Sequence, residues 1–243
     1  MAALDFDPEF LLDDMEYCLT LGFSETPDFQ DRAAWVFKAP EMSAFLDGDA
    51  GSKLLVVQGN HDATQFLSPL SYVCAKVTDF MSVSDAVICL TYFCSRHTDD
   101  WREPRANAQG LLVQLIGQLL NQPESRKRKK FKPDLSTLTG EDLSEIEEED
   151  LSATWRAFET IVKQLPKGTV VFCFIDGMSA YENSARRRET TMFMKKLCRL
   201  IRKVKGISLR CMVTYPGRSN FSDTWGIGFD RRKAIMLDVP ESV

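Results

Sequence analysis

Short apolar runs alternate with longer amphipathic stretches from Leu54 to the end of the chain. The apolar runs lie at 54–58, 86–94, 169–175, 208–214 and 234–239, and they show no regular polar face. Between them, apolar residues recur at helical spacing at 68–81, 107–121, about 150–165 and 186–204. Strands without a polar face that alternate with helices are typical of a parallel sheet covered on both sides. The pattern therefore predicts a three-layer α/β domain with a five-stranded sheet.

The first part of the chain has a different pattern. Residues 5–46 carry apolar side chains near helical spacing and are interrupted by Pro27 and Pro40. A charged stretch near 122–149, with a basic run at 126–132 and an acidic run from Glu141, interrupts the second part. We therefore predict an N-terminal helical segment at 1–46, an α/β domain at 47–243, and an insertion near 122–149 that is the least ordered part by composition.

The amino-acid composition limits the cellular compartments and the kinds of partner that we expect. The chain has 243 residues, 44% of them hydrophobic, a net charge of -5, and seven cysteines that mostly lie inside apolar runs. Buried thiols without paired spacing indicate reduced cysteines, and the start of the chain lacks the basic region of a signal peptide. No apolar run approaches the roughly 18 to 20 residues of a membrane helix. We expect a cytoplasmic protein, with the nucleus as the alternative, that binds no membrane and whose net charge gives no general attraction to nucleic acid. The basic run is interpreted as a solvated loop first and as a nuclear import signal second.

Gly59 opens a loop after the first predicted strand, where a nucleotide-binding protein carries its phosphate loop. The pattern G-x-x-x-x-G-K-[ST] supplies backbone amides and a lysine for phosphates and a hydroxyl for magnesium. Counted from Gly59, the second glycine, the lysine and the hydroxyl positions hold Thr64, Gln65 and Phe66. Ser68 or Ser71 could still supply a hydroxyl, and the helix end at Ser68 could attract an anion. The alternative is a loop that only leads into a helix.

Asp176 ends the apolar run 169–175, as a carboxylate does on the magnesium side of P-loop NTPases. The alternative is that Asp176 caps a turn with Gly177. Arg218 follows the next strand, where it could bind an anion or simply lie on the surface. Ligands of such sheets bind beyond the carboxyl ends of the strands, so the loops 59–71, 94–107, 176–182 and 214–221 should lie together. The candidate binding residues are Gly59, Ser68, Ser71, Asp176 and Arg218.

Two other constellations are weaker. His61 and His97 are the only histidines, and no Glu-x-x-His or paired-cysteine spacing accompanies them, so we expect no zinc site. Cys94 and His97 could form a nucleophile pair, but Cys94 also ends an apolar run, which favours a buried core thiol. We therefore name no catalytic and no metal-binding residue.

Six segments stand in a recognisable order between about Trp35 and Val239: FL at 45–46, LLVVQG at 54–59, LTYFC at 90–94, GLLVQLIGQLL at 110–120, FCFIDG at 172–177 and VTYPGR at 213–218. This order resembles the NACHT-like, nephrocystin-3-like N-terminal P-loop NTPase domain of large fungal STAND proteins. The resemblance implies strand order 5-1-4-3-2 and a switch that binds ATP or GTP with magnesium. The chain departs from the family at the missing Gly-Lys-Ser/Thr, so the domain is expected to be degenerate.

These observations lead to two main hypotheses about function. The first is a noncatalytic pseudo-NTPase domain without a cofactor, which acts as an interaction or regulatory module and binds proteins, including related STAND proteins or a second copy. The second is a nucleotide-binding NTPase switch with an atypical phosphate loop, which binds ATP or GTP with magnesium. A small-molecule or nucleic-acid binding module on the same frame is a third reading.

Overall fold

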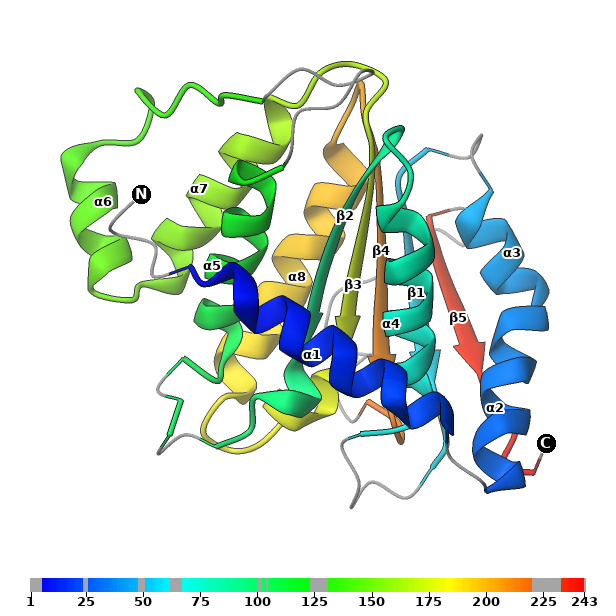
Figure 1. The fold of residues 1–243 in the computed structure, drawn as a ribbon. Helices are drawn as coiled ribbons and strands as arrows, with labels where there is room; N and C mark the ends of the chain where they lie inside the picture. Colours follow the sequence, from blue (N-terminus) through cyan, green and yellow to red (C-terminus); the bar gives the residue numbers. More distant parts are fainter. Residues whose placement is uncertain are drawn as a thin grey trace.

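The strands form one parallel sheet in the order that the resemblance implied. The computed structural model describes residues 6–23, 26–47, 51–61, 67–99, 102–103, 105–122, 131–219 and 233–242. Within these residues the sheet has five strands in the order β2-β3-β4-β1-β5. They are β1 (Lys53–Gln58), β2 (Val87–Phe93), β3 (Val170–Asp176), β4 (Ser208–Tyr215) and β5 (Ala234–Asp238). All pairings are parallel, so the carboxyl ends of the strands meet at one edge, which is the lower edge in Figure 1.

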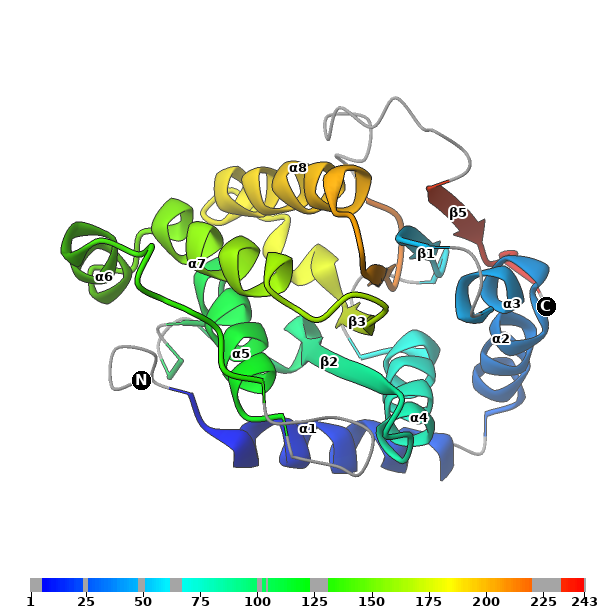
Figure 2. The same ribbon diagram turned by 90° about the horizontal axis from the view of Figure 1, so that it is seen from above.

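Helices cover both faces of the sheet, as predicted. Figure 2 shows α5 (Ala108–Leu120), α7 (Leu151–Lys163) and α8 (Arg187–Lys203) on one side. On the other side lie α1 (Pro8–Thr20), α2 (Pro27–Lys38), α3 (Pro40–Leu46) and α4 (Pro69–Ser82). Short 3₁₀ helices lie at Leu21–Phe23 (η1), Cys94–Arg96 (η2) and Met178–Tyr181 (η3). The sequence therefore predicted the layers correctly.

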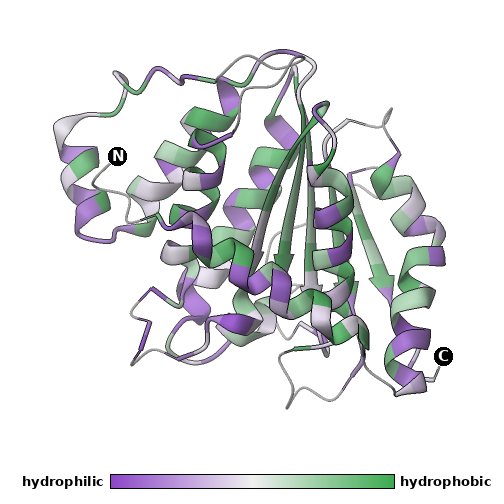
Figure 3. Cartoon of the chain, in the orientation of Figure 1, coloured by the Kyte–Doolittle hydropathy of each residue, from purple (hydrophilic) through white to green (hydrophobic). Residues whose placement is uncertain are grey.

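The two-sided burial explains why the strands lack a polar face. Leu54 and Val56 of β1 belong to the core cluster that includes α5, α7 and α8, whereas Leu55 and Val57 belong to the cluster with α2, α3 and α4. Successive side chains of a strand point to opposite faces, so both faces of a covered sheet require apolar residues. Figure 3 shows the strands almost entirely in hydrophobic colours.

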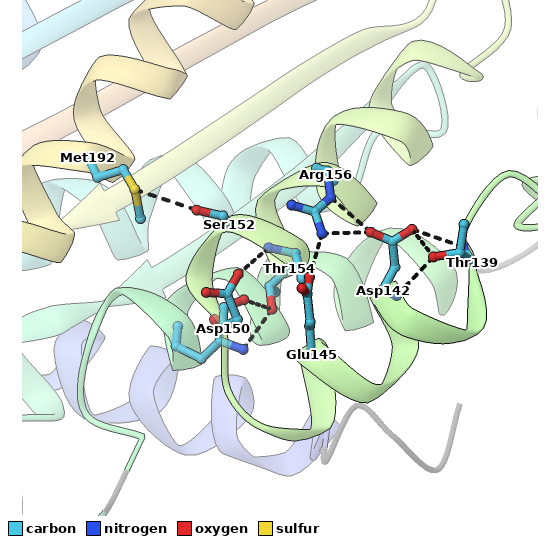
Figure 4. A network of polar contacts seen from close by, with 10 residues as sticks. Thr139, Asp142, Glu145, Asp150, Ser152, Thr154, Arg156 and Met192 are labelled. Atoms are coloured by element: carbon cyan, nitrogen blue, oxygen red, sulfur yellow. Dashed lines mark hydrogen bonds and ion pairs between the residues drawn. The ribbon is translucent and has the colours of Figure 1, made fainter.

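The acidic part of the insertion forms a helix that the composition did not predict. In α6 (Gly140–Glu147), Thr139 and Asp142 form a capping box, which supplies partners for the free amides of the first turn. Arg156 of α7 donates to Asp142 Oδ1 and Glu145 Oε2, each at 2.6 Å, and so ties α6 to the domain (Figure 4). The cap and the basic neighbour stabilise this helix, whereas the composition of the insertion had indicated little order. Residues 126–130 of the basic run lie outside the described residues.

Buried arginines join the N-terminal helices to the sheet. Arg32 of α2 donates from Nη1 to the carbonyl of Gly59 at 3.1 Å. Arg210 of β4, which is fully buried, donates from Nη1 to the carbonyls of Phe45 and Asp47 at the end of α3. The domain boundary after residue 46 stays a prediction. In the described part of the chain, every helix is too short or too polar to cross a membrane.

Candidate functional site

The loops beyond the carboxyl ends of the strands lie together where the structure describes them. Arg218 Nε, after β4, donates to Asn60 Oδ1, after β1, at 2.5 Å. Ser219 Oγ donates to Glu182 Oε1, after β3, at 2.7 Å. The loop after β2 joins them through Ser95, which bonds to the end of β3. The predicted convergence is confirmed for these residues, while 62–66, 100–101, 104 and 220–221 lie outside the described residues.

The carboxylate of Asp176 accepts hydrogen bonds from three hydroxyl groups. Ser71 Oγ and Ser95 Oγ donate to Oδ2 at 2.8 and 2.6 Å, and Thr214 Oγ1 donates to Oδ1 at 2.7 Å. We call these four residues the hydroxyl cluster. The turn-capping alternative for Asp176 is not what the structure shows, because the carboxylate bonds to these hydroxyls. Gly177, at φ +64°, makes the turn and donates its amide to Thr214 Oγ1 at 3.0 Å.

The topology brings the cluster together. Asp176 ends β3, Thr214 lies at the neighbouring end of β4, and Ser95 lies in η2 directly after β2. Ser71 comes from the first turn of α4. Asp176 is fully buried, and this burial raises the pKa of its carboxyl group, while the three hydroxyl bonds oppose the rise. The cluster thus joins three adjacent strand ends to one helix.

Ser71, and not the residue reached by counting from Gly59, contacts the strand-end aspartate. In P-loop NTPases, the loop Ser/Thr and the strand-end aspartate together hold the magnesium ion. The 2.8 Å bond from Ser71 to Asp176 joins the same two types of residue, a hydroxyl at a helix start and a carboxylate at a strand end. The counted position, Phe66, lies outside the described residues. Directly before Ser71, where the motif has lysine, stands Leu70, which is 3% exposed. The lysine is therefore missing in this register as well.

The backbone amides at the amino end of α4 already donate hydrogen bonds within the helix start. Pro69 has no amide hydrogen, and the amides of Leu70 and Ser71 donate to Ser68 Oγ at 3.2 Å and Ser68 O at 2.9 Å. The amide of Ser68 donates to Ser71 Oγ at 3.2 Å and completes a capping box. A helix end attracts anions through unpaired amides, so this helix end has little left to offer a phosphate.

The start of the loop after β1 is also closed. The amides of Gly59 and His61 donate to the carbonyls of Tyr215 and Pro216 at 2.8 and 2.9 Å. A Cβ atom on Gly59 would lie 2.4 Å from the carbonyl oxygen of Pro216, so only glycine fits this approach. The cavity between this turn, Arg32 and α4 has a volume of about 10 Å³, enough for about one water molecule. The described residues here do not fit a nucleoside triphosphate with magnesium.

A comparison with known protein families gives a match over most of the chain. Residues 31–214 match the family described as Nephrocystin 3, N-terminal. The chain belongs to this family. The nephrocystin 3 N-terminal match includes all four residues of the hydroxyl cluster, and a comparison with curated proteins found no match.

Helix α1 precedes the nephrocystin 3 N-terminal match and adds a second buried polar group. Asp14 of α1, 4% exposed, lies with Oδ2 2.7 Å from His97 Nε2, and His97 Nδ1 lies 2.8 Å from Glu103 Oε2. Phe10 stacks on the imidazole with ring centroids 4.1 Å apart. Each ring nitrogen of His97 therefore faces one carboxyl group, Nε2 that of Asp14 and Nδ1 that of Glu103. Sequence reasoning missed this contact because Asp14 and His97 are 83 positions apart and share no motif.

The other chemical candidates lack the surroundings that reactivity needs. Burial raises the pKa of the Cys94 thiol, and the nearby Asp176 raises it further, which disfavours a thiolate nucleophile. In the described part of the chain, no three histidine, cysteine or acidic residues are grouped so as to hold a metal ion.

Among the predicted binding residues, the structure brings Ser68, Ser71 and Asp176 together through hydrogen bonds, with Gly59 beside Ser68 at the small cavity. Arg218 is exposed and bonds to Asn60. Their role in ligand binding stays a prediction. Ser95 and Thr214 were missed as cluster members, and their only sequence signal was a hydroxyl at the end of an apolar run.

Proposed function

We propose that this chain is a noncatalytic NACHT-like module that acts through protein interaction or regulation. The observation that carries the proposal is the hydroxyl cluster with Leu70 beside it. Ser71 and Asp176 are kept in hydrogen-bonded contact, but the adjacent lysine position is apolar and buried. Phosphoryl transfer depends on positive charge around the terminal phosphates, and Leu70 supplies none.

The same contacts support a structural role for Asp176. A buried carboxylate is costly unless its lone pairs are satisfied, and here three hydroxyl groups satisfy them. The residue then holds β2, β3, β4 and α4 in place. A protein that has this fold but lacks the lysine for phosphate binding is better suited to offering a surface to a partner than to catalysing a reaction.

Turnover and binding measurements test the proposal. Purified chain should show no magnesium-dependent hydrolysis of ATP or GTP above the rate of a Ser71→Ala/Asp176→Asn variant, and calorimetry should detect no nucleotide binding that this variant abolishes. Micromolar binding that the double variant abolishes would contradict the noncatalytic module.

The second candidate is a nucleotide-binding switch with an atypical phosphate loop. The observation in its favour is the Ser71–Asp176 bond, which keeps the magnesium-side pair in contact. A ligand that binds only the native state raises its stability according to concentration and affinity. The switch therefore requires that Mg-ATP or Mg-GTP raise the Tm of the wild type and raise the Tm of Asp176→Asn much less. An equal shift in both proteins would eliminate it.

The proposal includes a cytoplasmic or nuclear protein of the fungal STAND lineage whose partners are related STAND proteins or a second copy. The family membership supports the NACHT-like part of this proposal. Light scattering of the purified chain across a concentration series tests the second copy, because self-association must raise the apparent mass with concentration. A constant monomer mass would remove that partner.

A further inference from the structure

Basic side chains line a hollow on α8, and no function given above uses them. The hollow has a volume of about 690 Å³. Its basic lining residues are Arg187, Arg188, Lys195, Lys196 and Arg199. The other described lining residues, among them Ser184 and Thr191, are uncharged. We call this surface the α8 basic hollow. Figure 2 shows α8 at the outside of its layer.

Helical geometry places the exposed charges of α8 on one face of the helix. Arg188, Lys195 and Arg199 are exposed and stand seven and eleven positions apart, which puts them on nearly the same face of an α-helix. At about 1.5 Å per residue, this row spans about 17 Å. The opposite face of α8 is buried, with Phe193, Leu197 and Ile201 in the core. The buried face holds the basic row in a fixed orientation.

The charges of this row are not neutralised within the described part of the chain. Arg188, Lys195 and Arg199 make no ion pair there, whereas Arg156 on the neighbouring helix donates to both Asp142 and Glu145 (Figure 4). Like charges four positions apart, such as Lys195 and Arg199, destabilise a helix. A bound anion would remove this repulsion.

Lys196 is half-buried and has charged neighbours of both signs. Its pKa is lowered, first by partial burial and then by the positive charges of Arg156 and Arg199, while Glu159 and Asp150 act in the opposite direction. A partly desolvated ammonium group near two guanidinium groups gains more from an anionic partner than a fully solvated one does.

We propose that the α8 basic hollow binds a compact small molecule that carries several phosphate groups. Guanidinium groups bind phosphate oxygens through two parallel hydrogen bonds, ammonium groups add point charges, and Ser184 and Thr191 offer hydroxyl donors. The volume lies in the range of about 300–1,000 Å³ that small-molecule sites occupy.

A compact ligand fits better than a nucleic acid. The row is short, the exposed Glu189 lies next to it, and the net charge of the chain is -5, so an extended polyanion would meet repulsion beyond the hollow. None of the lining residues belongs to the hydroxyl cluster. The inference therefore stands apart from the loss or survival of nucleotide hydrolysis.

Calorimetry of the full chain with tripolyphosphate and with inositol hexakisphosphate tests the proposal. The test variant is Arg188→Glu/Arg199→Glu. The matched control is Arg202→Glu/Lys203→Glu, which makes the same charge change on exposed positions of the same helix outside the hollow. We expect one bound molecule per chain, an affinity at least about tenfold weaker in the test variant, and a control close to wild type, because the test variant replaces two guanidinium donors with carboxylates that repel phosphate.

Other outcomes would overturn the proposal. They are no binding of either probe to the wild type, equal weakening in test and control variants, or tighter binding of a short single-stranded DNA than of either probe. The pair Arg188→Gln/Arg199→Gln removes the charge without reversing it and serves if the Glu pair lowers Tm. If ATP binds to the α8 basic hollow through its phosphates, this binding should be lost in Arg188→Glu/Arg199→Glu and kept in Ser71→Ala/Asp176→Asn. The two variants therefore distinguish the hollow from the hydroxyl cluster.

Discussion

Ser95→Ala is the cleanest perturbation of the hydroxyl cluster. Ser95 is 6% exposed, and its Oγ donates to Asp176 Oδ2 at 2.6 Å, the shortest of the three cluster bonds. Ser71 and Thr214 each take part in a second hydrogen bond, to the amides of Ser68 and Gly177. Substituting Ser95 therefore removes one bond to Asp176 and changes little else.

The expected cost follows from the charge on the acceptor. A hydrogen bond to a charged group contributes about 1.5–3 kcal/mol, against about 0.5–1.5 kcal/mol for a neutral pair. At a pH above the native pKa of Asp176, where the acceptor is ionised, we expect Ser95→Ala to lower the free energy of unfolding by about 2 kcal/mol. For a chain of 243 residues, this loss corresponds to a decrease in Tm of about 4–8 °C.

Urea unfolding and thermal unfolding, both followed by circular dichroism, measure this loss. The control is Ser82→Ala at the exposed end of α4, where Oγ donates to the carbonyl of Asp79, and its effect should stay within about 0.5 kcal/mol. In an Asp176→Asn background, the cost of Ser95→Ala should fall toward that of a neutral pair. A cost equal to the control, or one unchanged by Asp176→Asn, would refute the structural role of the charged cluster.

Three further predictions concern buried charge and backbone. Burial raises the pKa of the Asp176 carboxyl group in the native state, so above about pH 4 the native protein holds the carboxyl proton while the unfolded chain releases it. The free energy of unfolding of the wild type, measured relative to Asp176→Asn, should therefore fall as the pH rises to the native pKa, by at most about 1.4 kcal/mol per pH unit. A rise over this range in urea unfolding at a series of pH values would contradict this prediction. Arg210→Met should cost about 2–4 kcal/mol in urea unfolding, since it removes the donor to two carbonyls at the end of α3; a loss below 1 kcal/mol would show that these carbonyls find other partners. Gly177→Ala should lower the free energy of unfolding more than Gly51→Ala in the same assay. Both glycines have a similar positive φ (64° and 67°), but of the two only Gly177 has a close neighbour, because its Cβ would lie 2.8 Å from the Cβ of Ser95. Equal losses would mean that Ser95 moves aside.

Local pattern was sufficient to place most elements. The strands at 54–58, 86–94, 169–175, 208–214 and 234–239 were predicted to within two residues of the observed ends because fully apolar strands and amphipathic helices differ in period and composition over short windows. The strand order came from the family resemblance and is confirmed. Helix α6 was missed because its stability comes from a cap and from Arg156, not from an apolar face.

The sequence by itself determined the layers of this protein and the place of Asp176 at the end of an apolar strand, since both follow from hydrophobicity along a few neighbouring residues. Only the tertiary structure decided which hydroxyls reach that carboxylate. Ser71 and Asp176 are 105 positions apart, and Ser95 and Asp176 are 81 positions apart. Such contacts depend on strand order and on where α4 begins, which counting along a loop does not reveal. For that reason the motif position fell on Phe66 in the sequence, while the hydroxyl that meets the aspartate in the fold is that of Ser71.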